Sequence, residues 1–119
     1  MTDDIFAERV AKVRQRFMSS LGEKIDSTYA ALPGLGGTEP PAAAAVAEAY
    51  RRIHGIVGIG RTVGFPAVGT AAHDVEDVLR PPYHAGRGLT DDEISLLKTS
   101  LQVLREVATR DLQSSSPSH

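Results

Sequence analysis

Residues 41–63 read PAAAAVAEAYRRIHGIVGIGRTV, and this stretch decides which fold the chain adopts. Its apolar residues recur every three or four positions, as they do along one face of an α-helix. The positions on this face are Val46, Ala49, Tyr50, Ile53, Val57 and Gly60. Because proline is tolerated at the first position of a helix, the helix is predicted to begin at Pro41.

Three glycines, Gly55, Gly58 and Gly60, fall inside this helix. Each costs about 1 kcal/mol relative to alanine, so their total of about 3 kcal/mol is large beside a typical net stability of roughly 5–15 kcal/mol. Either the segment is not helical, or the close approach of another group requires the missing side chains. Residues 55–62, GIVGIGRT, differ at one position from a P-loop, but a P-loop follows a strand and no strand is predicted here.

Three further segments have the same periodicity and are separated by proline and glycine. The first spans residues 3–32, and its apolar face consists of Phe6, Val10, Val13, Phe17, Leu21, Ile25 and Leu32. The second begins at Pro66 and is predicted to end before the proline pair at positions 81 and 82. The third begins at Thr90, which forms a capping-box pattern with Glu93. Its apolar face consists of Ile94, Leu97, Leu101, Leu104 and Ala108.

Four amphipathic helices joined by short loops bury their apolar faces most economically against one another. We therefore expect an all-α chain, an up-down-up-down four-helix bundle with a long N-terminal helix. Residues 1–113 are expected to form one domain, and residues 114–119, which carry no apolar side chain, a disordered tail. A bundle that closes on itself predicts a monomer.

The composition excludes several classes of function. The chain of 119 residues has 13 Lys and Arg against 15 Asp and Glu, and a net charge of −2 is not typical of nucleic-acid-binding proteins. Without cysteine, the chain cannot hold a disulfide, a thiolate metal site or an iron–sulfur cluster. The N-terminus does not resemble a signal peptide, and no stretch is apolar enough to span a membrane, so we expect a complete cytoplasmic chain.

His54 lies at the border between the apolar face and solvent, one turn before Gly58 and next to Gly55. Because neither glycine has a side chain, the imidazole is predicted to be exposed on a rigid helix. A neutral imidazole is a good nucleophile toward phosphorus near neutral pH, and the phosphoramidate it forms can pass its phosphoryl group to a carboxylate. The small residues nearby would admit the active site of a second protein.

The pattern of a histidine, a glycine four residues later and another glycine six residues beyond resembles the motif of histidine-containing phosphotransfer (HPt) domains. Here these residues are His54, Gly58 and Gly64, and the resemblance extends by motif over residues 54–79. It implies that His54 is the phosphoacceptor of a two-component phosphorelay, with a response-regulator receiver domain or a hybrid sensor kinase as partner. It also implies a phosphoryl carrier without a cofactor rather than an enzyme, because magnesium and acidic residues would belong to the partner.

One position departs from the family pattern. HPt domains usually have a lysine three residues after the histidine, where this chain has Val57. Arg51 and Arg61 lie on the His54 side of the helix and are candidates for the missing positive charge. Partner contacts are expected at Arg52, Ile56 and Ile59. The absence of the lysine leaves open an alternative, a helical adaptor that binds receiver domains without transferring phosphoryl groups.

Two other interpretations have less support. A histidine kinase fragment is disfavoured because no nucleotide-binding domain follows and because Gly55 replaces the acidic residue common after a kinase histidine. His73, Glu76 and Asp77 have a spacing that could hold a metal ion on one face of a helix, but a solvated helix face is the usual meaning of such a cluster. We therefore predict no metal site.

Overall fold

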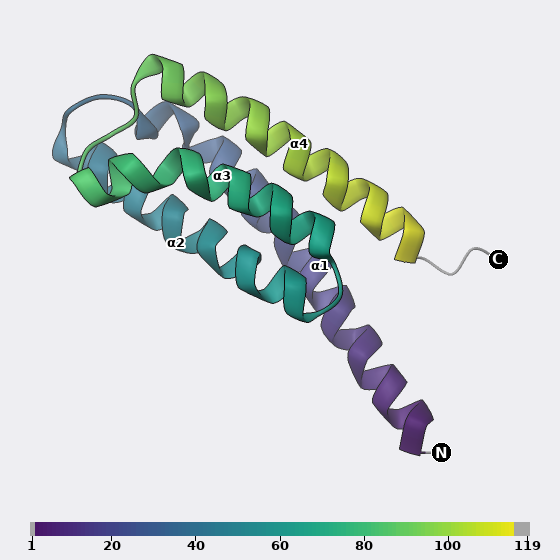
Figure 1. Ribbon diagram of the computed structural model, residues 1–119. Helices are drawn as coiled ribbons and strands as arrows, with labels where there is room; N and C mark the ends of the chain where they lie inside the picture. The colour runs from purple at the N-terminus through teal and green to yellow at the C-terminus, as the bar shows by residue number, and fades with distance from the viewer. Residues whose placement is uncertain (1, 116–119) are drawn as a thin grey trace.

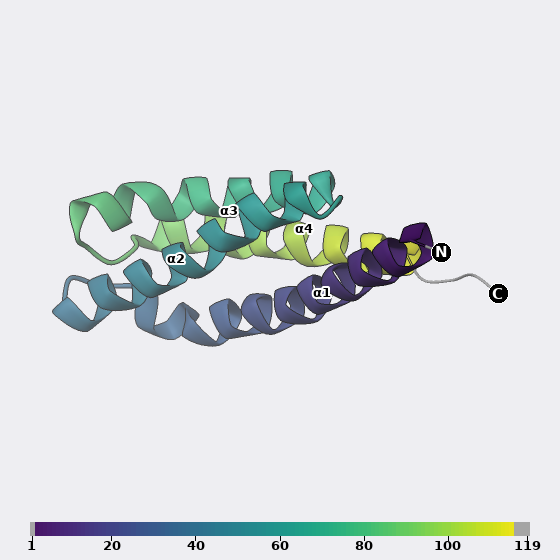
Figure 2. The ribbon, with the colours of Figure 1, turned by 90° about the horizontal axis from the view of Figure 1, so that it is seen from below.

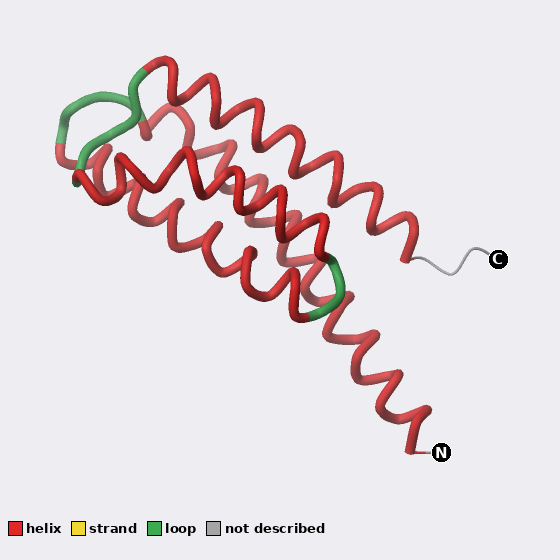
Figure 3. The backbone as a smooth tube through the Cα atoms, viewed as in Figure 1, coloured by secondary structure: helices red, strands yellow, loops and turns green. Residues whose placement is uncertain are grey.

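The computed structural model describes residues 2–115 (Figure 1). This part of the chain forms four helices, which are α1 (Thr2–Leu35), α2 (Pro40–Thr62), α3 (Pro66–Ala85) and α4 (Asp91–Ser115). Short loops join them (Figure 3), and the pairing of extended backbone over residues 2–115 is limited to one isolated bridge between Gly36 and Leu89. The all-α prediction is confirmed.

The helices are arranged in a ring of neighbours. Both α1 and α3 pack against α2 and α4, and within the described residues the backbones of the diagonal pairs do not come close to each other. Because each loop is short, consecutive helices run in opposite directions. The chain therefore forms the expected up-down-up-down bundle (Figure 1). None of the helices over residues 2–115 is long and apolar enough to cross a membrane.

All four helices contribute to a single apolar core. The largest fully buried side chains come from every predicted stripe, and they are Leu21, Ile25, Leu35, Val46, Ile53, Ile56, Val68, Val75, Leu79, Leu97, Leu101 and Leu104. Burying a side chain of this size contributes about 1.5–3 kcal/mol. This core fixes the rotation of each helix about its axis, and thereby the side chains that it turns toward solvent.

The first third of α1 departs from the prediction. Phe6, Val10 and Val13 were expected to be buried with the rest of the stripe, but they are 69%, 38% and 49% exposed. The 34 residues of α1 make it about 51 Å long at 1.5 Å per residue. Its beginning therefore extends past the turn between α2 and α3 and past the end of α4, where no other helix covers it (Figures 1 and 2).

The end of α3 also departs from the prediction. Pro81 and Pro82 do not end the helix, which continues to Ala85 and stops at Gly86, whose φ of 68° is left-handed. Each proline removes one backbone hydrogen bond. Packing compensates for this loss, because Pro82 is buried and Tyr83 stacks on Tyr50 of α2. The last turn of α3 thus lies beside α2 rather than in a loop.

The expected boundary between domain and tail is displaced as well. Helix α4 continues through Ser115, so residues 114 and 115, predicted to begin the tail, are helical. Residues 116–119 lie outside the described part of the chain. The predicted capping box at the start of α4 is confirmed, since the Glu93 backbone N–H donates to Oγ1 of Thr90 at 3.2 Å and the Thr90 N–H donates to Oε1 of Glu93 at 2.8 Å.

Candidate functional site

His54 projects from the second half of α2 into solvent. Pro40 and Pro41 occupy the first helical positions, and the alanines that follow have the highest helix propensity, so the helix is well established before the histidine. Ile53, the preceding residue, is fully buried and sets the rotation of the helix. The His54 side chain is left 66% exposed on a packed backbone.

A buried carboxylate from α3 supports one side of the His54 ring. Nδ1 of His54 lies 2.7 Å from Oε2 of Glu76, whose side chain is only 5% exposed. An ionised carboxylate can only accept a hydrogen bond, so Nδ1 is assigned as the donor. In the neutral ring the lone pair is then on Nε2, which makes Nε2 the atom of this exposed side chain that is available for chemistry.

Arg80, one turn further along α3, holds the second oxygen of this carboxylate. Its Nη2 donates to Oε1 of Glu76 at 2.5 Å, and its Nη1 donates to Oδ1 of Asp77 at 2.5 Å. Hydrogen bonds, first to Asp77 and then to Tyr50 and Glu76, raise the pKa of this guanidinium above the ordinary arginine value. Both oxygens of Glu76 are therefore engaged, one by a permanent cation and one by the histidine.

An aromatic column supports the ring of His54 from the N-terminal side of α2. Tyr50 stacks on His54 with ring centroids 5.8 Å apart and planes 15° apart. Tyr83 of α3 stacks in turn on Tyr50, with ring centroids 4.2 Å apart and planes 10° apart. Together with Glu76, the two tyrosines restrict how far the imidazole can rotate.

The glycines of α2 divide into two kinds. All three lie inside the helix, so the segment is helical despite their cost. A Cβ added at Gly60 would lie 3.3 Å from the backbone N of Gly69, so close packing of α2 on α3 accounts for that glycine. A Cβ at Gly55 or Gly58 would meet nothing within 4 Å. Packing therefore explains neither of these two, and both lie within one turn of His54.

The structure corrects the interpretation of Gly64. This residue has a φ of 93° in the turn between α2 and α3, a conformation that side chains rarely adopt. It lies ten positions beyond His54 in the sequence, about 15 Å along a helix axis. Gly64 is required by the turn and does not shape the surface beside the histidine.

Two of the three expected partner contacts are also corrected. Ile56 is 1% exposed and belongs to the core, because it lies two residues, or about 200°, around the helix from His54. The Arg52 side chain is 20% exposed and pairs with Glu48 at 3.2 Å, so little of it is available to a partner. Ile59 is 46% exposed, which keeps it a candidate contact.

Sequence reasoning considered only the arginines of α2 as the positive charge of the site and missed the arginine of α3 that contacts Glu76. Arg51 and Arg61 are exposed and form no ion pair within residues 2–115, whereas Arg80 of α3 contacts the carboxylate that holds His54. A signal for this network was present in the sequence. Glu76 interrupts the apolar face of α3, and an acidic residue at a core position requires a partner. Its buried neighbours on that face are Ala72, Val75 and Leu79.

The other acidic residues of α3 do not contact His54. Nδ1 of His73 lies 3.3 Å from Oδ2 of Asp77, an exposed pair one turn apart, while Glu76 faces His54 instead.

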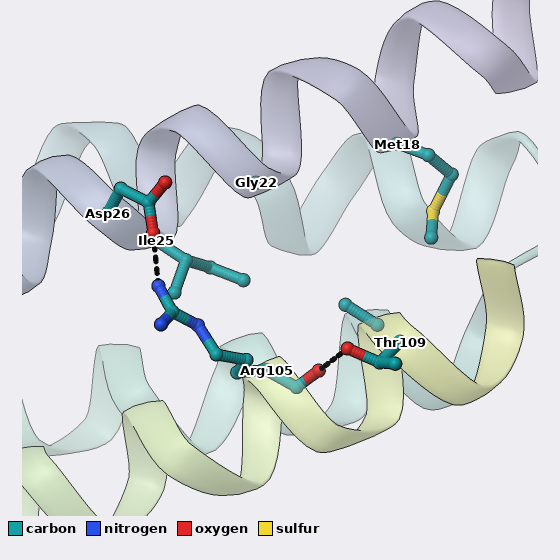
Figure 4. Close-up of a pocket in the computed structure, with 7 residues that line it drawn as sticks. Met18, Gly22, Ile25, Asp26, Arg105 and Thr109 are labelled. Carbon is teal, nitrogen blue, oxygen red and sulfur yellow. Dashed lines mark hydrogen bonds and ion pairs between the residues drawn. The ribbon is translucent and has the colours of Figure 1, made fainter.

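A groove of about 200 Å³ lies between α1 and α4 and is crossed by an ion pair between Arg105 and Asp26 (Figure 4). It is not part of the His54 site, which is built from α2 and α3.

An antiparallel bundle of four helices is the fold expected of a phosphotransfer domain. The chain belongs to the Hpt domain family, whose profile matches residues 12–107 and so includes His54, Glu76 and Arg80. Hpt domains are carriers rather than catalysts, and they interact with the receiver domains and kinases of phosphorelays. Neither the curated proteins nor the solved structures contain a significant match.

Proposed function

We propose that His54 is the phosphoacceptor of this protein and that it exchanges a phosphoryl group with the receiver aspartate of a response regulator or hybrid sensor kinase. The observation that carries this proposal is the pairing of Nδ1 with buried Glu76 at 2.7 Å, which in the neutral imidazole holds the proton on Nδ1 and leaves the lone pair on Nε2 of an exposed side chain. The other described histidines lack this support, because His73 pairs with exposed Asp77 and His84 lies at the rim of the aromatic column.

The transfer step follows from this arrangement. The Nε2 lone pair attacks the phosphorus of an aspartyl phosphate, the N–P bond forms as the P–O bond breaks, and the aspartate leaves as a carboxylate. The ring, protonated on Nδ1 and phosphorylated on Nε2, then carries a positive charge that Glu76 offsets. In the reverse step a receiver carboxylate attacks the phosphorus, and the imidazole leaves in its neutral form.

The surface around His54 suits such a partner. Gly58 leaves bare backbone one turn away. Ile59 is exposed but lies about 140° around α2 from His54, so it would meet a partner only at the margin of such an interface. Arg51 and Arg61 are exposed on the same side of α2 and would face the acidic residues of a receiver site. In this proposal those acidic residues and their magnesium belong to the partner. We further propose that the protein is located in the cytoplasm and is a monomer. Analytical ultracentrifugation would test the monomeric state.

The alternative is an adaptor that binds receiver domains without accepting a phosphoryl group. The observation in its favour is Val57, half-buried where the family usually has a lysine. The adaptor and the carrier predict the same surface but different chemistry at His54.

Transfer from a panel of purified receiver domains, each phosphorylated with radioactive acetyl phosphate, distinguishes the two. We expect acid-labile, base-stable label on the protein and none on a His54→Gln variant. The matched control is His73→Gln, which removes a histidine of α3 that pairs with Asp77 instead of Glu76 and should leave labelling unchanged. A complex with a receiver that forms without label would support the adaptor, and label retained in His54→Gln would contradict the assignment of the phosphoacceptor.

A further inference from the structure

The cation that contacts the His54–Glu76 pair comes from α3. Val57 takes the place of the usual lysine, and Arg51 and Arg61 form no ion pair within the described chain. Arg80 instead contacts Oε1 of Glu76 at 2.5 Å, while Oε2 of the same carboxylate lies 2.7 Å from Nδ1 of His54. One buried carboxylate therefore links a guanidinium to the imidazole.

We propose that Arg80 is a positioning residue that, by holding Oε1 of Glu76, aims Oε2 at Nδ1 of His54 and selects the tautomer with a nucleophilic Nε2. This inference rests on the proposed function of His54 and deepens it. Arg80 does not touch the reacting atoms, and its effect passes through the carboxylate.

The physical reason lies in the burial of Glu76. A carboxylate that is 5% exposed is poorly solvated, and without a cation it would lose charge or turn toward water. Arg80 prevents both, because its fork also donates to Asp77 at 2.5 Å and is thereby fixed to the surface of α3. The free imidazole of histidine prefers its proton on Nε2, so a nucleophilic Nε2 depends on an acceptor held beside Nδ1.

Charge balance gives Arg80 a second role in the same step. Glu76 contributes a negative charge beside His54 and Asp77 another on the adjoining surface of α3, and Arg80 contacts both carboxylates and offsets one of the two charges. Without the arginine, an incoming phosphoryl group would approach a site with one more uncompensated negative charge, which opposes its approach. Arg80 on α3 thus supplies a positive charge to this site in place of the lysine that the family usually has on α2.

The tautomer is measured directly in the unphosphorylated protein by long-range ¹H–¹⁵N correlation spectra of the His54 ring. We expect the Nδ1–H form in the wild type, a shift toward Nε2–H in Arg80→Gln, and its reversal in Arg80→Lys. Phosphoryl uptake should fall about tenfold in Arg80→Gln and recover in part in Arg80→Lys. Arg105→Gln, which breaks an exposed arginine pair on α4, is the control and should change neither reading.

The two readings separate this inference from the proposed function. An unchanged tautomer in Arg80→Gln would overturn the positioning role even if His54 accepts the phosphoryl group. A shifted tautomer without any phosphoryl uptake by the wild type would support the role of Arg80 and refute the proposed function. If Arg80→Gln fails to fold by circular dichroism, Asp77→Asn, which frees one arm of Arg80 on the exposed helix face, replaces it with the same expected shift.

Discussion

At the scale of single residues, the site combines one nucleophilic atom with supports that do not react. His54 is exposed, yet three contacts determine its orientation. These contacts are the carboxylate of Glu76, the ring of Tyr50 and the packed backbone of α2 beside Ile53. The exposed Nε2 is therefore preorganised, and a partner need not order it on binding.

A substitution at Gly58 should separate stability from transfer. Because a Cβ there meets nothing within 4 Å, Gly58→Leu is expected to stabilise α2 by about 0.5–1 kcal/mol through helix propensity. The new side chain would cover the surface one turn from His54, and we expect phosphoryl uptake from a receiver to fall at least about tenfold, or about 1.4 kcal/mol.

The matched control for this substitution is Gly22→Leu. Gly22 is an exposed glycine of α1 that also has nothing within 4 Å of an added Cβ, and it lines the groove between α1 and α4 rather than the His54 site. It should show a similar gain in urea denaturation with normal uptake. Normal uptake by Gly58→Leu would mean that partners do not approach over that turn.

At the scale of the elements, the start of α4 is determined by local chemistry that pH can probe. Arg87 donates to both oxygens of Glu93, at 2.7 and 3.1 Å, next to the capping box of α4. These hydrogen bonds, foremost that of Arg87, lower the pKa of Glu93 from 4.5 to about 2. The loop before α4 is thus an ordered connection.

This shift gives a signed dependence of stability on pH. A carboxylate whose pKa is lower in the folded state stabilises the fold at pH values above its unfolded pKa. The contribution of Glu93 is therefore complete above about pH 4.5 and is lost as the pH falls toward about 2. Glu93→Gln should unfold at lower urea concentration than wild type at pH 6, with the difference vanishing near pH 2. A difference that persists unchanged at pH 2 would contradict the assigned cause.

At the scale of the whole molecule, two loops at one end of the bundle tie the first helix pair to the second. The Leu89 backbone N–H donates to the Leu35 carbonyl at 2.8 Å. Beside it, a Cβ on Gly88 would lie 2.3 Å from the Gly37 carbonyl oxygen and 2.8 Å from that of Leu35. No side chain fits at Gly88 unless the loops separate.

Gly88→Ala should therefore destabilise the whole bundle. We expect a loss of about 1–3 kcal/mol from the displaced backbone, measured by urea denaturation. Gly34→Ala is the control, since Gly34 lies in the last turns of α1 with nothing within 4 Å of an added Cβ. Equal stability of the two variants would show that the loops do not make this contact in solution.

The sequence by itself determined the number of helices, most of their apolar faces, the capping box of α4 and His54 as the candidate nucleophile. These features depend on residues within one or two turns of each other, where helical periodicity and capping chemistry act. The sequence could not predict that the beginning of α1 is uncovered. The stripe of Phe6, Val10 and Val13 has the same pattern whether or not another helix lies opposite it.

Only the tertiary structure decided what surrounds the histidine. Glu76 lies 22 positions from His54, and Arg80 reaches the site from α3. Both contacts depend on the rotation of α3 against α2, which the buried core and the close approach of Gly60 and Gly69 determine. Likewise, α3 could continue through its two prolines because burial and stacking against α2 offset the lost backbone bonds. These packing free energies cannot be predicted from local sequence patterns, because they arise only when the helices contact one another.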